Sequence, residues 1–391
     1  MELTREEERI LQGEEGGTRQ RMMELLVGLG RVFSASRLVP VASAQVSGAS
    51  YKTIGRWGLE WLASLDAKVS VPTILNPVGM DRERWREAGI PPDFAGNQEK
   101  VLAVYQRLGV RLECTCTPYE ILPVRFGEHL AWAESSAVAY ANSAIGARTN
   151  REGGPGALAA AIIGKTPCYG LHLDEHRAPQ LAIRAEGFGG GGPGGHYGAL
   201  GFLAGKIAGN RVPFFHGIRP GPDDLKAMGA AMAASGAVAL FHVGGITPEA
   251  GRYLPLAGTL EEHTITAGEV AGLLEEMPVE AVAMGCPHCS AGELGEIARL
   301  LRGKRVRKPL FIFTSRHLRE ANQSLVEAIE ASGARVYADT CMVVSPMMDR
   351  FSSVMVDSGK AFAYVPSMCG ALARIGTRAE CVEEATGRGP G

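Results

Sequence analysis

The length, composition and charge of the chain exclude several classes of protein. At 391 residues and 46% hydrophobic, the chain is longer than one core usually organises, so we expect two or three packed domains. Its 40 basic and 42 acidic residues form no basic arm, which argues against nucleic acid as the main partner. No segment approaches the roughly 20 apolar residues of a membrane span. The acidic N-terminus lacks the apolar core of a signal peptide, so we expect a cytoplasmic protein with no membrane partner.

The N-terminal half contains elements of mixed type. A capping box at Thr4 and Glu7 predicts a helix at the N-terminus. Hydrophobic periodicity then predicts strands at 67–75 and 109–116, and helices at 99–109 and 134–146. The glycine tract at 187–195 formally matches the dinucleotide pattern G-x-G-x-x-G. Polyglycine satisfies that pattern almost automatically, and no acidic residue follows at ribose-binding spacing, so we expect only a loop there.

From about residue 206 strands and helices alternate. Strands are predicted at 211–218, 237–243, 279–285, 309–315 and 335–341. Helices are predicted at 222–236, from Pro248 with Thr247 as cap, from a capping box at Thr266 and Glu269, and at 291–303 and 318–333. This order predicts an α/β fold with largely parallel sheets. We divide it into an N-terminal α/β domain (1–130), a middle domain (131–270) and a C-terminal domain (271–391).

Three cysteines occupy equivalent positions along the chain. Cys116, Cys286 and Cys341 each follow the end of a predicted strand, and parallel sheets gather ligands at that edge. The three segments could therefore converge on one site. Cys286 and Cys289 form a C-x-x-C, but no second such pair suggests a structural zinc site. His288 between them could cap the next helix, orient a ligand or bind metal.

The remaining thiols have a simpler interpretation. Free cysteines often have no chemical role, and we expect Cys114, Cys168, Cys369 and Cys381 to be core or surface thiols. Three converging thiolates would suit an iron–sulfur cluster with one iron free to bind substrate. If Cys289 completed the ligand set, the cluster would instead be an electron-transfer or redox centre. A zinc-stabilised binding protein is the third possibility.

Charged and polar residues in other segments could bind an anion. Arg148, Asn150 and Arg151 lie just before a predicted helix that starts near Gly153, and paired guanidinium groups beside a helix N-terminus favour carboxylate or phosphate. The arginines could instead pair with Glu134 or Glu152. Further polar candidates lie in glycine-containing turns or near the C-terminus: Ser47, Asn76, Glu128 and Lys360. For Lys360, a solvated lysine at the start of a strand is the more usual case.

A series of motifs resembles the large subunit of the aconitase X family, a branch of the aconitase superfamily. The motifs include "VSGASYKTIG", "PTILNPVGMDRERW", "CTCTPY", "ANSAIGARTNREGGPG", "ALFHVGGITPEA", "GCPHCS" and "ADTC". They run in order from about residue 4 to residue 382, nearly the whole chain. The resemblance implies an aconitase-like fold, with several α/β units around a central iron–sulfur site, and hydro-lyase activity.

The resemblance also implies a substrate and a partner. Single-chain bacterial members dehydrate cis-3-hydroxy-L-proline, and split, mainly archaeal members dehydrate (R)-mevalonate 5-phosphate to trans-anhydromevalonate 5-phosphate. This chain ends without a small swivelling domain, so we expect that domain on a separate small subunit, in a heterodimer. The split architecture and Cys286 favour the mevalonate phosphate reaction.

The implied site combines metal ligands with groups that hold an anionic substrate. Cys116, Cys286 and Cys341 would hold a 4Fe-4S cluster, or its 3Fe-4S form. Arg148 and Arg151 would anchor anionic groups of the substrate, supported by the following residues: Asn76, Asn150 and Lys360. The proton acceptor would be Ser47, Glu128 or a serine of the small subunit.

Overall fold

Three parallel sheets and one antiparallel strand pair make up the fold. The computed structural model describes residues 1–188, 196–274 and 276–387. Within these ranges the three larger sheets have strand orders β3-β2-β4, β8-β7-β6-β9 and β12-β11-β10-β13-β14. All their pairings are parallel, and only β1 and β5 pair antiparallel. The predicted α/β class with largely parallel sheets is confirmed.

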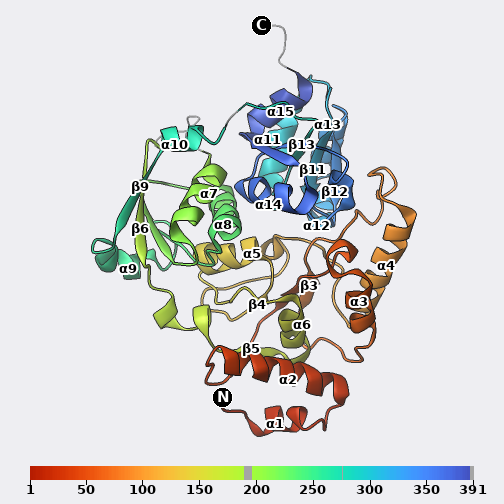
Figure 1. Ribbon diagram of the computed structural model, residues 1–391, viewed down its shortest axis with the longest axis vertical. Coiled ribbons are helices and arrows are strands. Elements are labelled where there is room, and N and C mark those ends of the chain that lie inside the picture. Colours follow the sequence, from red (N-terminus) through yellow and green to blue (C-terminus); the bar gives the residue numbers. More distant parts are fainter. Residues whose placement is uncertain (189–195, 275, 388–391) are drawn as a thin grey trace.

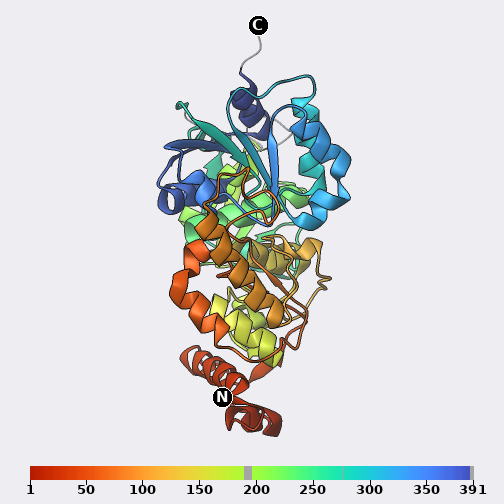
Figure 2. The same cartoon turned by 90° about the vertical axis from the view of Figure 1, so that its right-hand side faces the viewer.

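The N-terminal part forms one end of the molecule (Figures 1 and 2). Its strands are β1 (Leu38–Pro40), β2 (Ala44–Val46), β3 (Thr73–Leu75), β4 (Ala131–Trp132) and β5 (Lys165–Pro167). Its helices are α1 (Arg5–Leu11), α2 (Gly17–Val32), α3 (Tyr51–Ala63), α4 (Pro92–Arg107) and α6 (Gly154–Ile163). The capping box of Thr4 and Glu7 is confirmed at α1. Helix α6 is rich in alanine and packs against α2 and β2, which buries it almost completely.

The middle part contains a four-stranded sheet with helices around it (Figure 1). Its strands are β6 (Leu181–Glu186), β7 (Pro213–His216), β8 (His242–Val243) and β9 (Glu262–Thr266). Its helices are α5 (Ser135–Tyr140), α7 (Tyr197–Ala208), α8 (Pro222–Gly236), α9 (Ala250–Ala257) and α10 (Ala267–Ala271). Helices α7 and α8 pack with their backbones in contact. A Cβ added at Gly236 would lie only 1.9 Å from the carbonyl oxygen of Gly205, which shows how close the two helices are.

The C-terminal part contains the five-stranded sheet, at the opposite end from α1 (Figure 2). Its strands are β10 (Ala281–Met284), β11 (Leu310–Thr314), β12 (Arg335–Ala338), β13 (Ser353–Val356) and β14 (Leu372–Ile375). Its helices are α11 (Ala291–Leu301), α12 (Arg316–Ala321), α13 (Gln323–Glu330), α14 (Gly359–Cys369) and α15 (Arg378–Thr386). All four neighbouring strand pairs run parallel, so the carboxyl ends of these strands meet at one edge.

Several predicted elements differ from the structure. The helix predicted at 318–333 is two helices, because Asn322 has non-helical dihedrals (φ −125°, ψ 40°). Helix α9 begins at Ala250 rather than Pro248, since the Thr247 hydroxyl bonds to the backbone of Val243 instead of capping a helix. The strand predicted at 109–116 is only an isolated bridge between Leu75 and Cys114. Most of the predicted glycine loop, 189–195, lies outside the described residues.

The predicted division into three parts stays a prediction, but sheet membership shifts its first boundary. Strand β4 pairs with β2, and β5 pairs with β1, so residues after 130 still belong to the N-terminal sheets. A boundary drawn by sheets falls after β5 rather than at 130, although α5, which precedes β5 in the chain, packs on α8 of the middle part. Among the described residues, no helix is both long and apolar enough to span a bilayer.

Candidate active site

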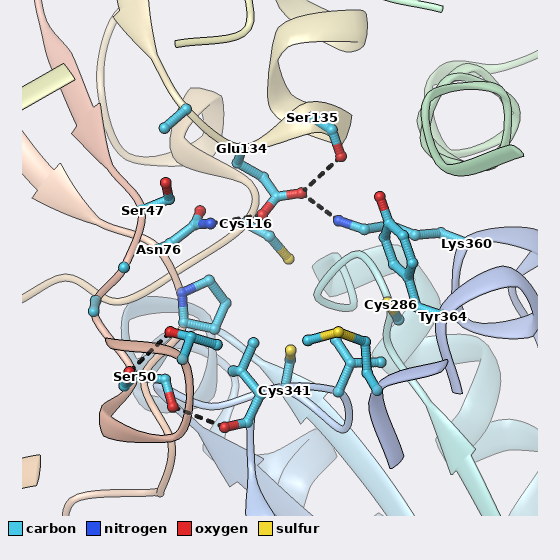
Figure 3. A pocket seen from close by; sticks show the side chains of 18 of the residues that line it. Ser47, Ser50, Asn76, Cys116, Glu134, Ser135, Cys286, Cys341, Lys360 and Tyr364 are labelled. Carbon is cyan, nitrogen blue, oxygen red and sulfur yellow. Dashed lines mark hydrogen bonds and ion pairs between the residues drawn. The ribbon is translucent and has the colours of Figure 1, made fainter. Parts of the chain in front are cut away.

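A cavity of about 440 Å³ lies where the N-terminal and C-terminal parts meet. Its walls come from the N-terminus of α3, the loop after β3, the start of α5, the segments after β10 and β12, and α14. The polar and sulfur-bearing lining residues are Ser47, Ser50, Thr53, Asn76, Cys116, Glu134, Ser135, Arg151, Cys286, Cys341, Lys360, Tyr364 and Met368. Figure 3 labels most of them, including the three cysteines, Glu134 and Lys360. Residues more than 300 positions apart therefore share one cavity.

The structure brings Cys116, Cys286 and Cys341 to this cavity. Cys286 follows β10, Cys341 follows β12, and Cys116 follows the bridge between Leu75 and Cys114. All three side chains are buried, with exposed fractions of 3–6%, and their sulfur atoms face the same space (Figure 3). Burial raises the pKa of all three thiols, in Cys116 to about 12, so without a cation they are neutral. Their role as metal ligands stays a prediction.

The other five cysteines do not line the cavity. All eight cysteines are free and buried. Cys289 lies in a different apolar cluster, against Leu294 and Ile297 of α11, so it does not complete a fourth position beside the three thiols. Within the described residues, the core assignment of Cys114, Cys168, Cys369 and Cys381 agrees with their burial.

His288 lies behind the cysteines and contacts their segments. Its ring is fully buried and bonds through Nδ1 to the Thr115 hydroxyl (3.1 Å) and through Nε2 to the Thr340 carbonyl (2.8 Å). Its backbone N–H donates to the sulfur of Cys116 (3.1 Å). Burial lowers the pKa of His288 to about 4, so the ring is neutral at pH 7.

Lys360 and Glu134 form a buried ion pair in the cavity wall. Lys360 lies in the first turn of α14, not at a strand start, and its Nζ donates to Glu134 and to the Ser136 hydroxyl (3.2 Å). Glu134 also accepts from the Asn76 amide (2.7 Å) (Figure 3). Burial alone would raise the pKa of Glu134, but Lys360 and these hydrogen bonds outweigh it and lower the pKa to about 2. Burial alone would lower the pKa of Lys360, and Glu134 together with the neighbouring thiols reverses that effect.

Ser47 and Arg151 also line the cavity. Arg151 is largely exposed and reaches the cavity from the loop before α6. Helix α6 begins directly against Ser47. A Cβ added at Gly154 would lie only 2.6 Å from the Ser47 carbonyl oxygen, which shows how close the two segments are. The helix start, Ser47 and Arg151 therefore lie together at one side of the cavity.

Three predicted site residues lie elsewhere. Arg148 pairs with Asp174 and donates to the His172 carbonyl, away from the cavity. Asn150 is buried and bridges the backbones of Tyr169 and Leu171, where it lines a second cavity. Glu128 accepts the backbone N–H of Arg125 within its own loop. These three residues lie near Arg151 or near strand ends in the sequence, but that nearness did not predict their positions in the structure. The alternative pairing of Arg148 with Glu134 or Glu152 is also wrong.

Sequence reasoning missed Glu134, Ser135 and Tyr364 as lining residues. Glu134 follows β4 and is the N-cap of α5, where its carboxylate accepts the Ser136 N–H. An acidic residue between a strand and a helix was the available signal, and it was interpreted only as a partner for arginine. Tyr364 lies one turn after Lys360 on α14, which is visible only once that segment is known to be helical.

The donor set fits an iron–sulfur cluster better than a single ion. Among the described residues, no group of three or more His, Cys, Asp or Glu side chains is close enough to hold one metal ion. In a cluster each thiolate binds a different iron, so the thiols surround a larger group. Three free, buried thiols around one cavity, beside a lysine that favours thiolate, fit that requirement. This geometry disfavours the zinc-stabilised alternative.

Comparison with known proteins agrees with this architecture. Models of the first, second and third domains of aconitase X match residues 1–175, 179–275 and 279–387. A crystal structure titled as the holo form of Thermococcus kodakaraensis aconitase X superposes with a TM-score of 0.91 at 41% identity, covering 98% of this chain and all of that one. The parallel sheets are thus those of an aconitase-like α/β protein. The chain belongs to the aconitase X family.

Curated relatives include proteins with two kinds of name. The phosphomevalonate dehydratase large subunit of Methanosarcina mazei is 52% identical, covering 99% of this chain and 98% of that protein. The protein of the same name from Methanothermobacter thermautotrophicus is 50% identical, with 94% of each covered. The cis-3-hydroxy-L-proline dehydratase of Pseudomonas aeruginosa is 34% identical, and the match covers 97% of this chain but 69% of that longer protein.

Proposed function

We propose that this chain is the large subunit of a hydro-lyase that dehydrates (R)-mevalonate 5-phosphate to trans-anhydromevalonate 5-phosphate. The observation that carries the proposal is the cavity in which three buried thiols face a lysine–carboxylate pair. Four relatives at 43–52% identity are named phosphomevalonate dehydratase large subunit, whereas the cis-3-hydroxy-L-proline dehydratases are 34% and 31% identical. These identities favour the phosphorylated substrate.

Cys116, Cys286 and Cys341 would hold the iron–sulfur cluster, in the 4Fe-4S or 3Fe-4S form. When bound, the cluster supplies a Lewis-acidic iron that can polarise a hydroxyl or carboxylate. A fully ligated electron-transfer cluster needs a fourth protein ligand, and Cys289 lies in the apolar cluster under α11. The donor set therefore supports a substrate-binding cluster.

Dehydration requires a base for the proton beside the carboxylate and stabilisation of the anionic groups. Lys360 carries a positive charge into the cavity and would bind a substrate carboxylate. Glu134, with its pKa near 2, is a weak base, so we assign it to holding Lys360 in place together with Asn76. Arg151, at the opening, would bind a second anionic group. Arg148 and Asn150 stay in the proposal only as residues that shape the loop before Arg151.

Ser47 is the candidate proton acceptor on this chain. It lines the cavity beside the start of α6, whereas Glu128 lies outside the cavity. A serine hydroxyl needs a neighbouring base to accept a proton at neutral pH. A serine from the partner subunit is the alternative that we retain.

A small subunit is part of the proposal. The relatives' name, large subunit, implies a second chain, and the cis-3-hydroxy-L-proline dehydratases extend beyond the region matched here. We propose a heterodimer in which a small swivel-type subunit completes the cavity. The free state of all eight cysteines fits a reducing compartment, so we place the enzyme in the cytoplasm.

The test uses the chain together with its small-subunit partner after anaerobic reconstitution with iron and sulfide. We expect the anhydro product from (R)-mevalonate 5-phosphate and no product from cis-3-hydroxy-L-proline. If the cluster-loaded heterodimer dehydrates only cis-3-hydroxy-L-proline, the proposed substrate is wrong. A loaded heterodimer that acts on neither but exchanges electrons would support the redox alternative instead.

A further inference from the structure

His288 contacts all three segments that carry the cavity thiols. Its Nε2 meets the carbonyl of Thr340, the residue before Cys341, and its Nδ1 meets the hydroxyl of Thr115, the residue before Cys116. The histidine itself lies two residues after Cys286. Among the described residues, no other side chain hydrogen-bonds to both Thr115 and Thr340.

We propose that His288 is a positioning residue that fixes the relative places of Cys116, Cys286 and Cys341 for the metal group they hold. This inference rests on the cluster of the proposed function, but not on the identity of the substrate. The three cysteines lie on separate loops, and no disulfide joins these loops. Their spacing therefore depends on noncovalent contacts between the loops.

The hydrogen bonds of His288 define its tautomer and engage both ring nitrogens. A carbonyl oxygen can only accept, so the ring proton lies on Nε2 and points at Thr340. Nδ1 then accepts the hydroxyl proton of Thr115. Since both ring nitrogens are engaged with protein atoms, His288 could bind metal only by breaking one of these bonds.

The main chain of His288 adds a contact with a thiol itself. Its N–H donates to the sulfur of Cys116 at 3.1 Å. Hydrogen bonds to sulfur ligands and contacts that orient the ligands tune metal centres and contribute to their affinity for the metal. The His288 carbonyl in turn accepts from Nζ of Lys226 (3.2 Å), which pairs with Glu293, so the backbone of this loop is also held from behind.

Removal of the ring has a specific expected effect. His288→Ala removes the hydrogen bonds that the ring makes to the Thr115 hydroxyl and the Thr340 carbonyl, and it opens a void between the three loops. The thiols then sample more positions. Loss of a residue that orients metal ligands typically weakens metal binding by about 10-fold or more.

The experiment compares His288→Ala with His288→Gln and His242→Ala in the full chain with its partner. His242 is also buried, and its Nε2 bonds to the Arg177 carbonyl at 2.8 Å rather than to a residue beside one of the three cysteines. The readouts are iron and sulfide per chain after reconstitution, the electron paramagnetic resonance spectrum, and the alkylation rate of the thiols before reconstitution.

We expect His288→Ala to bind the cluster about 10-fold more weakly, with a changed spectrum and faster alkylation of Cys116 and Cys341. His242→Ala loses comparable stability but keeps cluster and spectrum. His288→Gln, whose amide can still reach the Thr340 carbonyl, recovers most of the binding. If His288→Ala does not fold, Thr115→Val is measured by the same readouts; it keeps the side-chain shape but removes the bond to His288 together with the contacts of the hydroxyl with Thr117.

Wild-type cluster content, spectrum and alkylation rates in His288→Ala, or in Thr115→Val where that variant decides, would overturn the proposal. An equal loss in the His242→Ala control would do the same, because the effect would then be general destabilisation. A loaded wild-type heterodimer without dehydratase activity would refute the proposed function and leave this inference standing.

Discussion

A buried ion pair controls the electrostatics of the cavity. Lys360 and Glu134 have side-chain exposures of 6% and 11%, and each charge is compensated mainly by the other. Removing one member of a buried pair is strongly destabilising, because the other charge remains buried without a partner.

We therefore expect Lys360→Met to lose about 3–5 kcal/mol of unfolding free energy and most of the dehydratase activity. Denaturant unfolding and steady-state kinetics check the two effects. Arg177→Met is the control, because Arg177 forms a buried pair with Glu249 away from the cavity. It should reduce stability while preserving kcat, and a Lys360→Met enzyme with wild-type kcat would contradict the role of Lys360.

Glu152 makes stability depend on pH. Burial raises the pKa of Glu152 from 4.5 to about 7. The Thr166 hydroxyl donates a hydrogen bond to the carboxylate (2.9 Å), which lowers the pKa by a smaller amount. A carboxyl with a raised folded pKa contributes stability below its unfolded pKa and loses it as the pH rises through 7.

Glu152→Gln removes this titration and keeps an oxygen that can accept from Thr166. Between pH 5 and pH 8 we expect the variant to gain about 2 kcal/mol relative to wild type. Urea unfolding at both pH values measures the difference. If the difference in unfolding free energy between the variant and wild type is the same at pH 5 and pH 8, Glu152 is ionised in the folded protein at both.

At the scale of elements, loops after strands β10 and β12 place two of the three thiols. Parallel strands end at one sheet edge, so cysteines just beyond them meet there. The third comes from the N-terminal part, where Leu75 and Cys114 form a bridge. The thiol site thus needs two separately folded sheets to be in contact.

Serine substitution tests this arrangement. Each of Cys116→Ser, Cys286→Ser and Cys341→Ser should lose at least most of the bound iron, since serine is a poor ligand of similar size. Cys289→Ser and Cys381→Ser should keep it, because both thiols lie in the apolar cluster beside α11. Iron and sulfide assays give the result. Iron loss in Cys289→Ser equal to that in Cys286→Ser would favour a fully ligated cluster.

At the scale of the whole molecule, a network of charges joins the N-terminal and C-terminal parts beside the cavity. Asp81 is fully buried and accepts from the backbone of Ala338 and from Arg319, both at 2.8 Å. In the opposite direction, the carboxylate of Asp339 in the C-terminal part accepts a hydrogen bond from the guanidinium of Arg82 in the N-terminal part (2.8 Å). These contacts hold the segment before Cys341 against the loop that follows β3.

Asp81→Asn should therefore loosen the junction. We expect a loss of about 3–5 kcal/mol in unfolding free energy and faster alkylation of Cys341 in the metal-free chain. Asp349→Asn, which removes a half-exposed pair with Lys52, should lose no more than about 1 kcal/mol. Equal effects of the two substitutions would show that the network does not brace the junction.

The sequence by itself determined the features that depend on neighbours along the chain. Helix α8 starts at Pro222 and ends at Gly236 as predicted, and the capping box of Thr266 and Glu269 forms at α10. The parallel α/β class followed from the alternation of such segments. The resemblance to aconitase X likewise rests on motifs that can be read in order along the chain.

Only the tertiary structure decided which side chains share the cavity. Arg148 and Arg151 are three residues apart, yet one pairs with Asp174 and the other reaches the cavity. The partner of Lys360 is Glu134, 226 residues earlier. Local signals fix dihedral angles and capping, whereas the pairing of buried charges and the meeting of three thiols depend on how separately formed sheets pack. That packing is set by buried surface contributed from the whole chain.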